Sequence, residues 1–154
     1  MKRFFLIAAL LSLALTGFSQ IVEGEDGLFY DKEDQLYSGK YTEYFDNGFI
    51  KLEMIVKDGL KDGIVKYYYR DGKIKEQRSY KAGKMDGLWL TFNEKGTKTG
   101  EARYKDHLKH GKWFIWDENG TLRYDMTYKE GKKTDVWIMY GPDGKEQQRK
   151  DYSK

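Results

Sequence analysis

The side chains that most often carry out chemistry in proteins are sparse in this sequence. Its two histidines, His107 and His110, stand three residues apart in a loop, with no cysteine and no clear third ligand beside them. The serines beyond residue 20 are Ser38, Ser79 and Ser153, and none has a histidine near it in sequence, so no catalytic triad is indicated. Carboxylates are plentiful but recur along the chain, as on a solvated surface, rather than as one pair in a cleft. We therefore expect no enzyme activity, no metal site and no cofactor.

Aromatic side chains are the residues whose spacing does suggest a site. Trp89, Trp113 and Trp137 follow one another at intervals of 24 residues, and Tyr41 holds the same place two intervals before Trp89. Two further series keep the same interval: Tyr44, Tyr68, Phe92, Trp116 and Tyr140, and then Tyr80, Tyr104, Tyr128 and Tyr152. A row of rings on a protein surface can bind apolar side chains or sugars. The sequence therefore makes Trp89, Trp113, Trp137 and Tyr41 a candidate binding ladder.

Glycines repeat with the same 24-residue period as the aromatic residues. They are Gly39, Gly63, Gly87 and Gly111 in one series, Gly48, Gly72, Gly96, Gly120 and Gly144 in a second, and Gly59, Gly83 and Gly131 in a third. Several registers that persist without an insertion are the signature of a repeat protein. The chain is predicted to contain five full units.

Each unit has the pattern of one β-hairpin. In the unit that begins at Gly111, residues 113–116 are apolar, as strands prefer, and Asn119-Gly120 is a tight-turn pair. Residues 122–129 then alternate between apolar and polar side chains, as a strand with one covered face does. The fold class predicted is all-β: a single-layer antiparallel meander of ten to twelve strands, elongated and twisted. Strands are expected over residues 39–45, 76–80, 89–92 and 123–129.

The loop length of each hairpin decides which residues share a face. A three-residue loop at 118–120 places Trp116 and Phe114 on the face of Tyr124 and Tyr128, and sends Trp113 to the charged face. Trp116, Tyr124 and Tyr128 are then the candidate association face, and the tryptophan ladder stands among charges. A four-residue loop reverses this assignment and puts the ladder on the apolar face.

The pattern Gly-x-Trp-x-x-aromatic, followed by Asn/Asp-Gly and then Tyr-x-x-Gly, resembles the bacterial variant of the MORN repeat. The resemblance covers about residues 28–152. It implies an array of short antiparallel hairpins that form one elongated sheet. It also implies a role in protein association, and some members of the family are labelled antitoxins of the YwqK type.

The first 19 residues have the pattern of a secretory signal peptide. Lys2 and Arg3 precede an apolar run at 4–15, and the small residues Gly17 and Ser19 stand before a cleavage point. The run is too short to cross a bilayer, which takes about 20 residues. Residues 20–35 read as either a leader or a capping hairpin, and residues 36–154 as the five-unit array. We expect an exported protein without a transmembrane segment, located in the periplasm, at the cell surface or outside the cell.

The net charge of +3 depends largely on this leader, because removal of Lys2 and Arg3 leaves 26 basic against 25 acidic side chains. A near-neutral chain does not suggest a nucleic-acid partner. The sequence favours an exported, non-catalytic binding or scaffold module that associates with another protein of the cell envelope or as a weak homodimer. The alternatives are a glycan-binding module that uses the tryptophan ladder and an antitoxin-like inhibitor of a partner protein.

Cleavage is predicted between Ser19 and Gln20. Mass spectrometry of the exported protein should find Gln20, free or cyclised, at the N-terminus. Recovery of only the full-length, cell-retained chain would contradict this prediction.

Overall fold

The computed structural model describes residues 21–153, so the predicted signal peptide (1–19) and Lys154 lie outside the described residues. All regular elements of the described part are strands. They are β1 (Val22–Glu23), β2 (Phe29–Tyr30), β3 (Gly39–Tyr44), β4 (Ile50–Lys57), β5 (Leu60–Lys61), β6 (Gly63–Tyr68), β7 (Ile74–Lys81), β8 (Lys84–Phe92), β9 (Lys98–Lys105), β10 (Leu108–Lys109), β11 (Gly111–Trp116), β12 (Leu122–Lys129), β13 (Lys132–Tyr140) and β14 (Glu146–Asp151).

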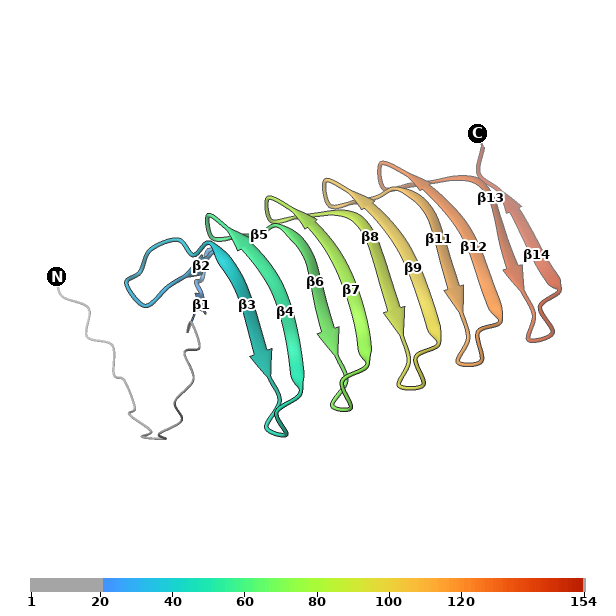
Figure 1. Cartoon of the computed structure of the whole chain (residues 1–154). Coiled ribbons are helices and arrows are strands. Elements are labelled where there is room, and N and C mark those ends of the chain that lie inside the picture. Colours follow the sequence, from blue (N-terminus) through green and yellow to red (C-terminus); the bar gives the residue numbers. More distant parts are fainter. Residues whose placement is uncertain (1–20, 154) are drawn as a thin grey trace.

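Twelve of these strands form one open antiparallel sheet in which neighbours in sequence are neighbours in space. The order is β14-β13-β12-β11-β9-β8-β7-β6-β4-β3, with β10 paired to β9 and β5 paired to β4. Figure 1 shows the units side by side in an elongated, curved row, with hairpin turns along one long edge and the loops between units along the other. The predicted single-layer meander of hairpin repeats is confirmed. Between residues 21 and 153, no helix is present that would be long and apolar enough to cross a membrane.

The hairpin turns have three-residue loops, one of the two lengths that the sequence left open. In the fourth unit, the Asp117 backbone N–H donates to the Thr121 carbonyl at 2.9 Å, and the Gly120 N–H donates to the Asp117 carbonyl at 3.0 Å. The Asp117 carboxylate accepts the N–H groups of Asn119 (3.0 Å) and Thr121 (2.9 Å), which stabilises the turn from inside. Gly120 completes the loop with a φ of 85°, a left-handed conformation that glycine adopts without a steric cost.

A β-bulge beside each hairpin turn overturns the predicted assignment of faces. Trp116 does lie opposite Leu122, as the three-residue loop requires, but the register then shifts, so that Ile115 pairs with Tyr124 and Trp113 with Met126. Arg123 is the extra residue, and one unpaired residue exchanges the faces of everything beyond it. The prediction that Phe114 and Trp116 share a face with Tyr124 is wrong, and Trp113 lies on the tyrosine side. The same shift recurs in all five hairpins.

The loops between units are two-residue turns that hydrogen-bond to one another along the second long edge. Ala82 and Gly83 both have positive φ, 47° and 78°, as a type I′ turn requires. The Gly83 N–H donates to the Lys61 carbonyl of the preceding loop at 2.8 Å, and the Gly131 N–H donates to the Lys109 carbonyl at 2.8 Å. His107 occupies the same place with a φ of 68° and donates to the Met85 carbonyl at 2.9 Å. Each unit is therefore joined to the next at the loop as well as through strand pairing.

The N-terminal residues 21–37 fold against the first two units and make the densest core of the described chain. Phe29 is buried in a cluster with Met54, Val56 and Val65. The backbone of this segment joins the first inter-unit loop, because the Phe29 N–H donates to the Gly59 carbonyl at 2.8 Å and the Gly59 N–H donates to the Tyr37 carbonyl at 2.9 Å. The strands farther along the chain receive no comparable cover.

Substitution of the turn glycine Gly96 by valine is predicted to destabilise the protein by about 1–2 kcal/mol, because a β-branched residue resists positive φ. Gly96 has a φ of 86°, and an added Cβ would meet no atom within 4 Å, so the cost is one of backbone conformation and not of crowding. Urea unfolding of the wild type, Gly96→Val and Gly96→Asn measures it. Asparagine tolerates this conformation, so Gly96→Asn should lose much less, and a valine variant as stable as the wild type would refute the turn assignment.

Candidate binding face

One face of the sheet carries a continuous ladder of aromatic rings, and it is called the ladder face below. Trp89, Trp113 and Trp137 alternate along it with the tyrosines of the neighbouring strands. The ring centroids lie 5.7 Å apart for Tyr80–Trp89, 4.7 Å for Trp89–Tyr104, 5.1 Å for Tyr104–Trp113, 5.2 Å for Trp113–Tyr128, 5.0 Å for Tyr128–Trp137 and 5.0 Å for Trp137–Tyr152. The rings are inclined to one another by 46–63°, the tilted and edge-on geometry that aromatic pairs favour. Each ring is thus covered mainly by its two neighbours.

The indole N–H groups connect successive units. Each one donates to a backbone carbonyl ten residues earlier: Trp89 to Ser79 at 3.1 Å, Trp113 to Arg103 at 2.9 Å, and Trp137 to Thr127 at 2.9 Å. Ser79 lies within a register shift between adjacent units, where the backbone ladder is interrupted, and Thr127 is the first paired residue after the corresponding shift. The tryptophans therefore have a structural function, because they satisfy carbonyl oxygens that strand pairing serves incompletely.

A row of ammonium groups lies over the ladder. Lys109 Nζ is 4.5 Å from the centre of the Trp113 ring and 4.9 Å from that of Tyr128. Lys133 Nζ is 4.6 Å from Trp137 and 5.2 Å from Tyr152, and Lys150 Nζ is also 5.2 Å from Tyr152. These distances are within the range of cation–π attraction. Among the described residues, none of these three lysines takes part in an ion pair with a carboxylate.

On the opposite face, two lysines near the rings of the fourth unit are paired with carboxylates. Lys112 pairs with Asp125 at 2.7 Å, and Lys98, which lies 4.2 Å from the centre of the Trp116 ring, pairs with Glu101 at 2.8 Å. On the ladder face, burial raises the pKa of the Tyr104 and Tyr128 phenols, so both stay neutral at physiological pH and offset no lysine. The C-terminal part of the ladder face is therefore positively charged.

The structure divides the predicted site residues differently from the sequence. Trp89, Trp113, Trp137 and Tyr41 lie on the ladder face together with Tyr124 and Tyr128, whereas Trp116 lies on the opposite face. The predicted association face was thus wrong for Trp116. Because of the bulge, Trp113 lies on the face of Tyr124, which is the face that the alternative assignment gave it, and not on that of Asp125. Tyr41 packs against the N-terminal cluster and has no ring contact with the ladder among the described residues.

The sequence interpretation missed the lysines over the rings. Lys61, Lys109 and Lys133 do keep the 24-residue spacing, with Met85 at the intervening position, so the repeat contained a signal for them. It also missed Gln148 and Lys150 of the last strand, whose counterparts three units earlier are Glu76 and Arg78.

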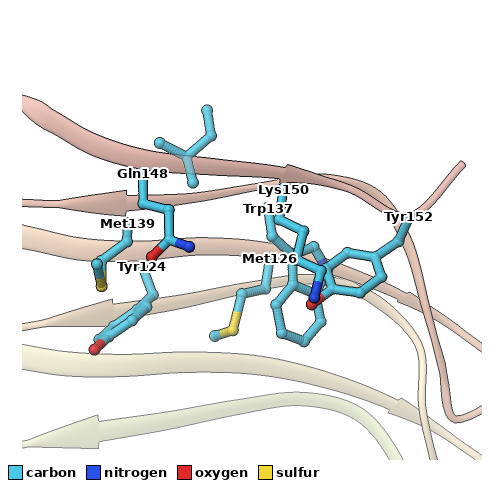
Figure 2. A pocket seen from close by; sticks show the side chains of 8 residues that line it. Tyr124, Met126, Trp137, Met139, Gln148, Lys150 and Tyr152 are labelled. Carbon is cyan, nitrogen blue, oxygen red and sulfur yellow. The ribbon is translucent and has the colours of Figure 1, made fainter.

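An open hollow of about 150 Å³ lies at the C-terminal end of the ladder face. Figure 2 shows Tyr124, Met139 and Gln148 on one side of it and Trp137, Lys150 and Tyr152 on the other, with Met126 between them. Its floor is buried, since Met126 is 8% exposed, while Tyr124 at the rim is 39% exposed. In residues 21–153 no group of three or more metal-ligating side chains comes together, here or elsewhere. The arrangement suits the binding of an apolar side chain.

The open sheet and its stacked hairpins define a repeat protein of the β-hairpin class. Residues 61–82 and 109–130 match the MORN repeat variant, so the second and fourth units are repeats of that family, as the resemblance predicted. Each match runs from a lysine over the ladder face to the next inter-unit loop and contains one whole hairpin. A search of curated proteins gives no match to the chain.

Trp113→Phe is predicted to cost more stability than Trp116→Phe, by about 0.5–1.5 kcal/mol, the net worth of a typical hydrogen bond. Phenylalanine cannot replace the indole N–H that Trp113 donates to Arg103. Trp116 is the matched control, since its indole N–H makes no hydrogen bond within residues 21–153. Denaturant unfolding of the two variants measures the difference, and equal losses would show that the indole bond adds nothing.

Proposed function

We propose that the protein is an exported, non-catalytic binding module that acts in protein–protein association through the C-terminal half of its ladder face. Its partner is another protein of the cell envelope, and the module supplies a preformed sheet surface. The MORN-type repeats support a β-sheet module of this general kind. Export rests on the sequence pattern of residues 1–19.

The observation that carries the proposal is the unequal cover of the ladder face. Over the first two units the chain covers this face with Phe29, which is only 6% exposed, and with Ile21 and Tyr37 packed around it. Over the last units Ile115 and Tyr124 remain 42% and 39% exposed. The chain therefore shows by its own folding that an apolar segment fits this face, and it leaves the other half of the face open. Burial of such surface stabilises a complex by roughly 25 cal/mol per Å² before the costs of association.

The ring geometry favours a protein partner over a sugar. A sugar stacks on the flat face of an aromatic ring, and it needs that face to be open. Here tyrosines contact the tryptophan rings at 4.7–5.7 Å, and lysine ammonium groups lie above Trp113 and Trp137. The ladder presents ring edges, methionine side chains and ammonium groups, which suit side chains of another protein.

The variant Tyr124→Glu tests the proposed function, because it places a charge at the open rim with little effect on the buried floor. Tagged wild type and variant are used to capture proteins from the cell envelope, and the captured proteins are compared by quantitative mass spectrometry. At least one protein should bind the wild type and be lost with Tyr124→Glu.

The matched control is Ile64→Glu, which introduces the same charge at a side chain that is 46% exposed on the opposite face. It should keep the partner, and thermal unfolding should confirm that both variants are folded. Light scattering over a concentration series would reveal a homodimer instead of a second protein. A partner that survives Tyr124→Glu, or a polysaccharide bound in its place on a glycan array, would contradict the proposed function.

A further inference from the structure

We propose that the hollow at the C-terminal end of the ladder face binds an acidic peptide segment, which inserts one aromatic side chain between Tyr124 and Trp137. This inference rests on the proposed function and specifies the chemistry of the partner. It follows from the way in which the chain fills the equivalent place three units earlier.

The segment that fills the earlier place is itself acidic and aromatic. Residues 21–37 hold six carboxylates and one lysine, for a net charge of −5, and they carry Phe29 into the sheet. Phe29 packs with Met54 and Val65, which stand 72 residues before Met126 and Trp137 in the repeat. Lys61 Nζ lies 5.2 Å from the centre of the Phe29 ring, in the same manner in which Lys133 lies over Trp137.

The earlier place accepts Phe29 because the repeat leaves room for it there. Val65 stands where later units have Trp89, Trp113 and Trp137, and it is only 1% exposed beside Phe29. The segment also brings Glu23 and Ile21 to the hollow that Phe29, Met54 and Lys61 line. An aromatic ring with a carboxylate close to it in space is thus the ligand that this face already holds.

The open hollow at the C-terminal end has the size for one ring. Its volume is about 150 Å³, and an apolar cavity of about that volume in another protein accommodates benzene. Tyr124, Met126, Met139 and Trp137 line it with apolar surface. Lys150 and Gln148 stand at its rim, so the residues beside the inserted ring meet polar groups.

The charge at the rim differs between this hollow and the equivalent place that Phe29 fills. At the equivalent rim, Glu76 forms an ion pair with Arg78, whereas here the corresponding residues are Gln148 and Lys150. Replacement of a carboxylate by an amide leaves Lys150 uncompensated, and Lys133 nearby is uncompensated as well. A ligand with carboxylates restores the balance, and a basic ligand is repelled.

A synthetic peptide with the sequence of residues 21–37 is the probe, titrated into the protein and followed by isothermal calorimetry at low salt. We expect saturable one-to-one binding that weakens as salt is added. A peptide with Phe29→Ala should fail to bind. A peptide in which the six carboxylates are amides should bind about tenfold more weakly, since electrostatic complementarity is lost.

The protein variant that locates the site is Gln148→Glu, which supplies the missing carboxylate at the rim with almost no change in shape. It should weaken binding about fivefold, the upper range for an exposed ion pair. Gln147→Glu is the matched control, because it makes the same chemical change one residue away at a side chain that does not line the hollow. It should bind as the wild type does, and circular dichroism verifies the fold of both.

Several outcomes would overturn the inference. They are absence of saturable binding up to millimolar peptide, equal affinity of the amidated peptide, and equal effects of Gln148→Glu and Gln147→Glu. A wild-type dimer that Gln148→Glu dissociates would make a second copy of the chain the occupant, and a preference for an acidic polysaccharide would make it a glycan. In the first three cases a captured protein that depends on Tyr124 would still support the proposed function, so the two proposals fail separately.

Discussion

A sheet that is one layer thick has no second layer to cover its apolar face, and the rest of this structure depends on that constraint. Most globular domains bury one face of a sheet against helices or a second sheet. Here the rings of neighbouring strands tilt against one another, so each tryptophan of the ladder is covered by the tyrosines on both sides of it. A cationic side chain also lies over each of these rings: Arg78 over Trp89, Lys109 over Trp113 and Lys133 over Trp137. A side chain on this face is therefore half-buried by its own row, and removal of one member exposes two others. Because each ring is covered by the rings of the neighbouring strands, the aromatic residues must recur at a regular interval in the sequence.

The aromatic ladder lacks a covering neighbour at each of its two ends, and the structure differs between these ends. At the first end residues 21–37 add Phe29 and a second layer over Met54 and Val56, and the most deeply buried residues of the described chain are found there. At the other end β14 is an edge strand whose residues are all exposed, and they include Glu146, Arg149 and Asp151. Charged residues on an edge strand discourage the addition of further strands. The edge is thus protected by charge, while the face beside it remains open.

The sequence was sufficient to predict the fold, but it was not sufficient to predict which side chains share a face of the sheet. The glycine and aromatic periods predicted the number of units and the hairpins, because those features repeat without an insertion, but they left the loop length open between three and four residues. The bulge at Arg123 exchanges the two faces of the first strand of each hairpin relative to the prediction. No particular residue type marks this bulge in the sequence, because the same position in the other units holds Lys51, Lys75, Thr99 and Gln147.

This exchange of faces made the sequence-based assignment of the candidate site residues partly wrong. Trp116 was expected beside Tyr124 and lies on the other side of the sheet, whereas Trp113 was expected on the face of Asp125 and lies on that of Tyr124. The replacement of tryptophan by Val65 was visible in the sequence, but its meaning depended on Phe29, which is distant in the chain and reaches the gap only through the fold. A contact between segments far apart in sequence is the kind of information that a repeat pattern does not contain.

The location of the buried cluster also has a consequence for the order in which the chain acquires its structure. Phe29, Met54, Val56 and Val65, together with the side chains packed on them, all precede residue 81. A ribosome makes the N-terminal part first, and in a repeat array each unit needs only its neighbours. The first two units can thus assemble as a nucleus while the later ones are still being synthesised. Each later hairpin then adds to a finished edge, and growth proceeds in one direction toward β14.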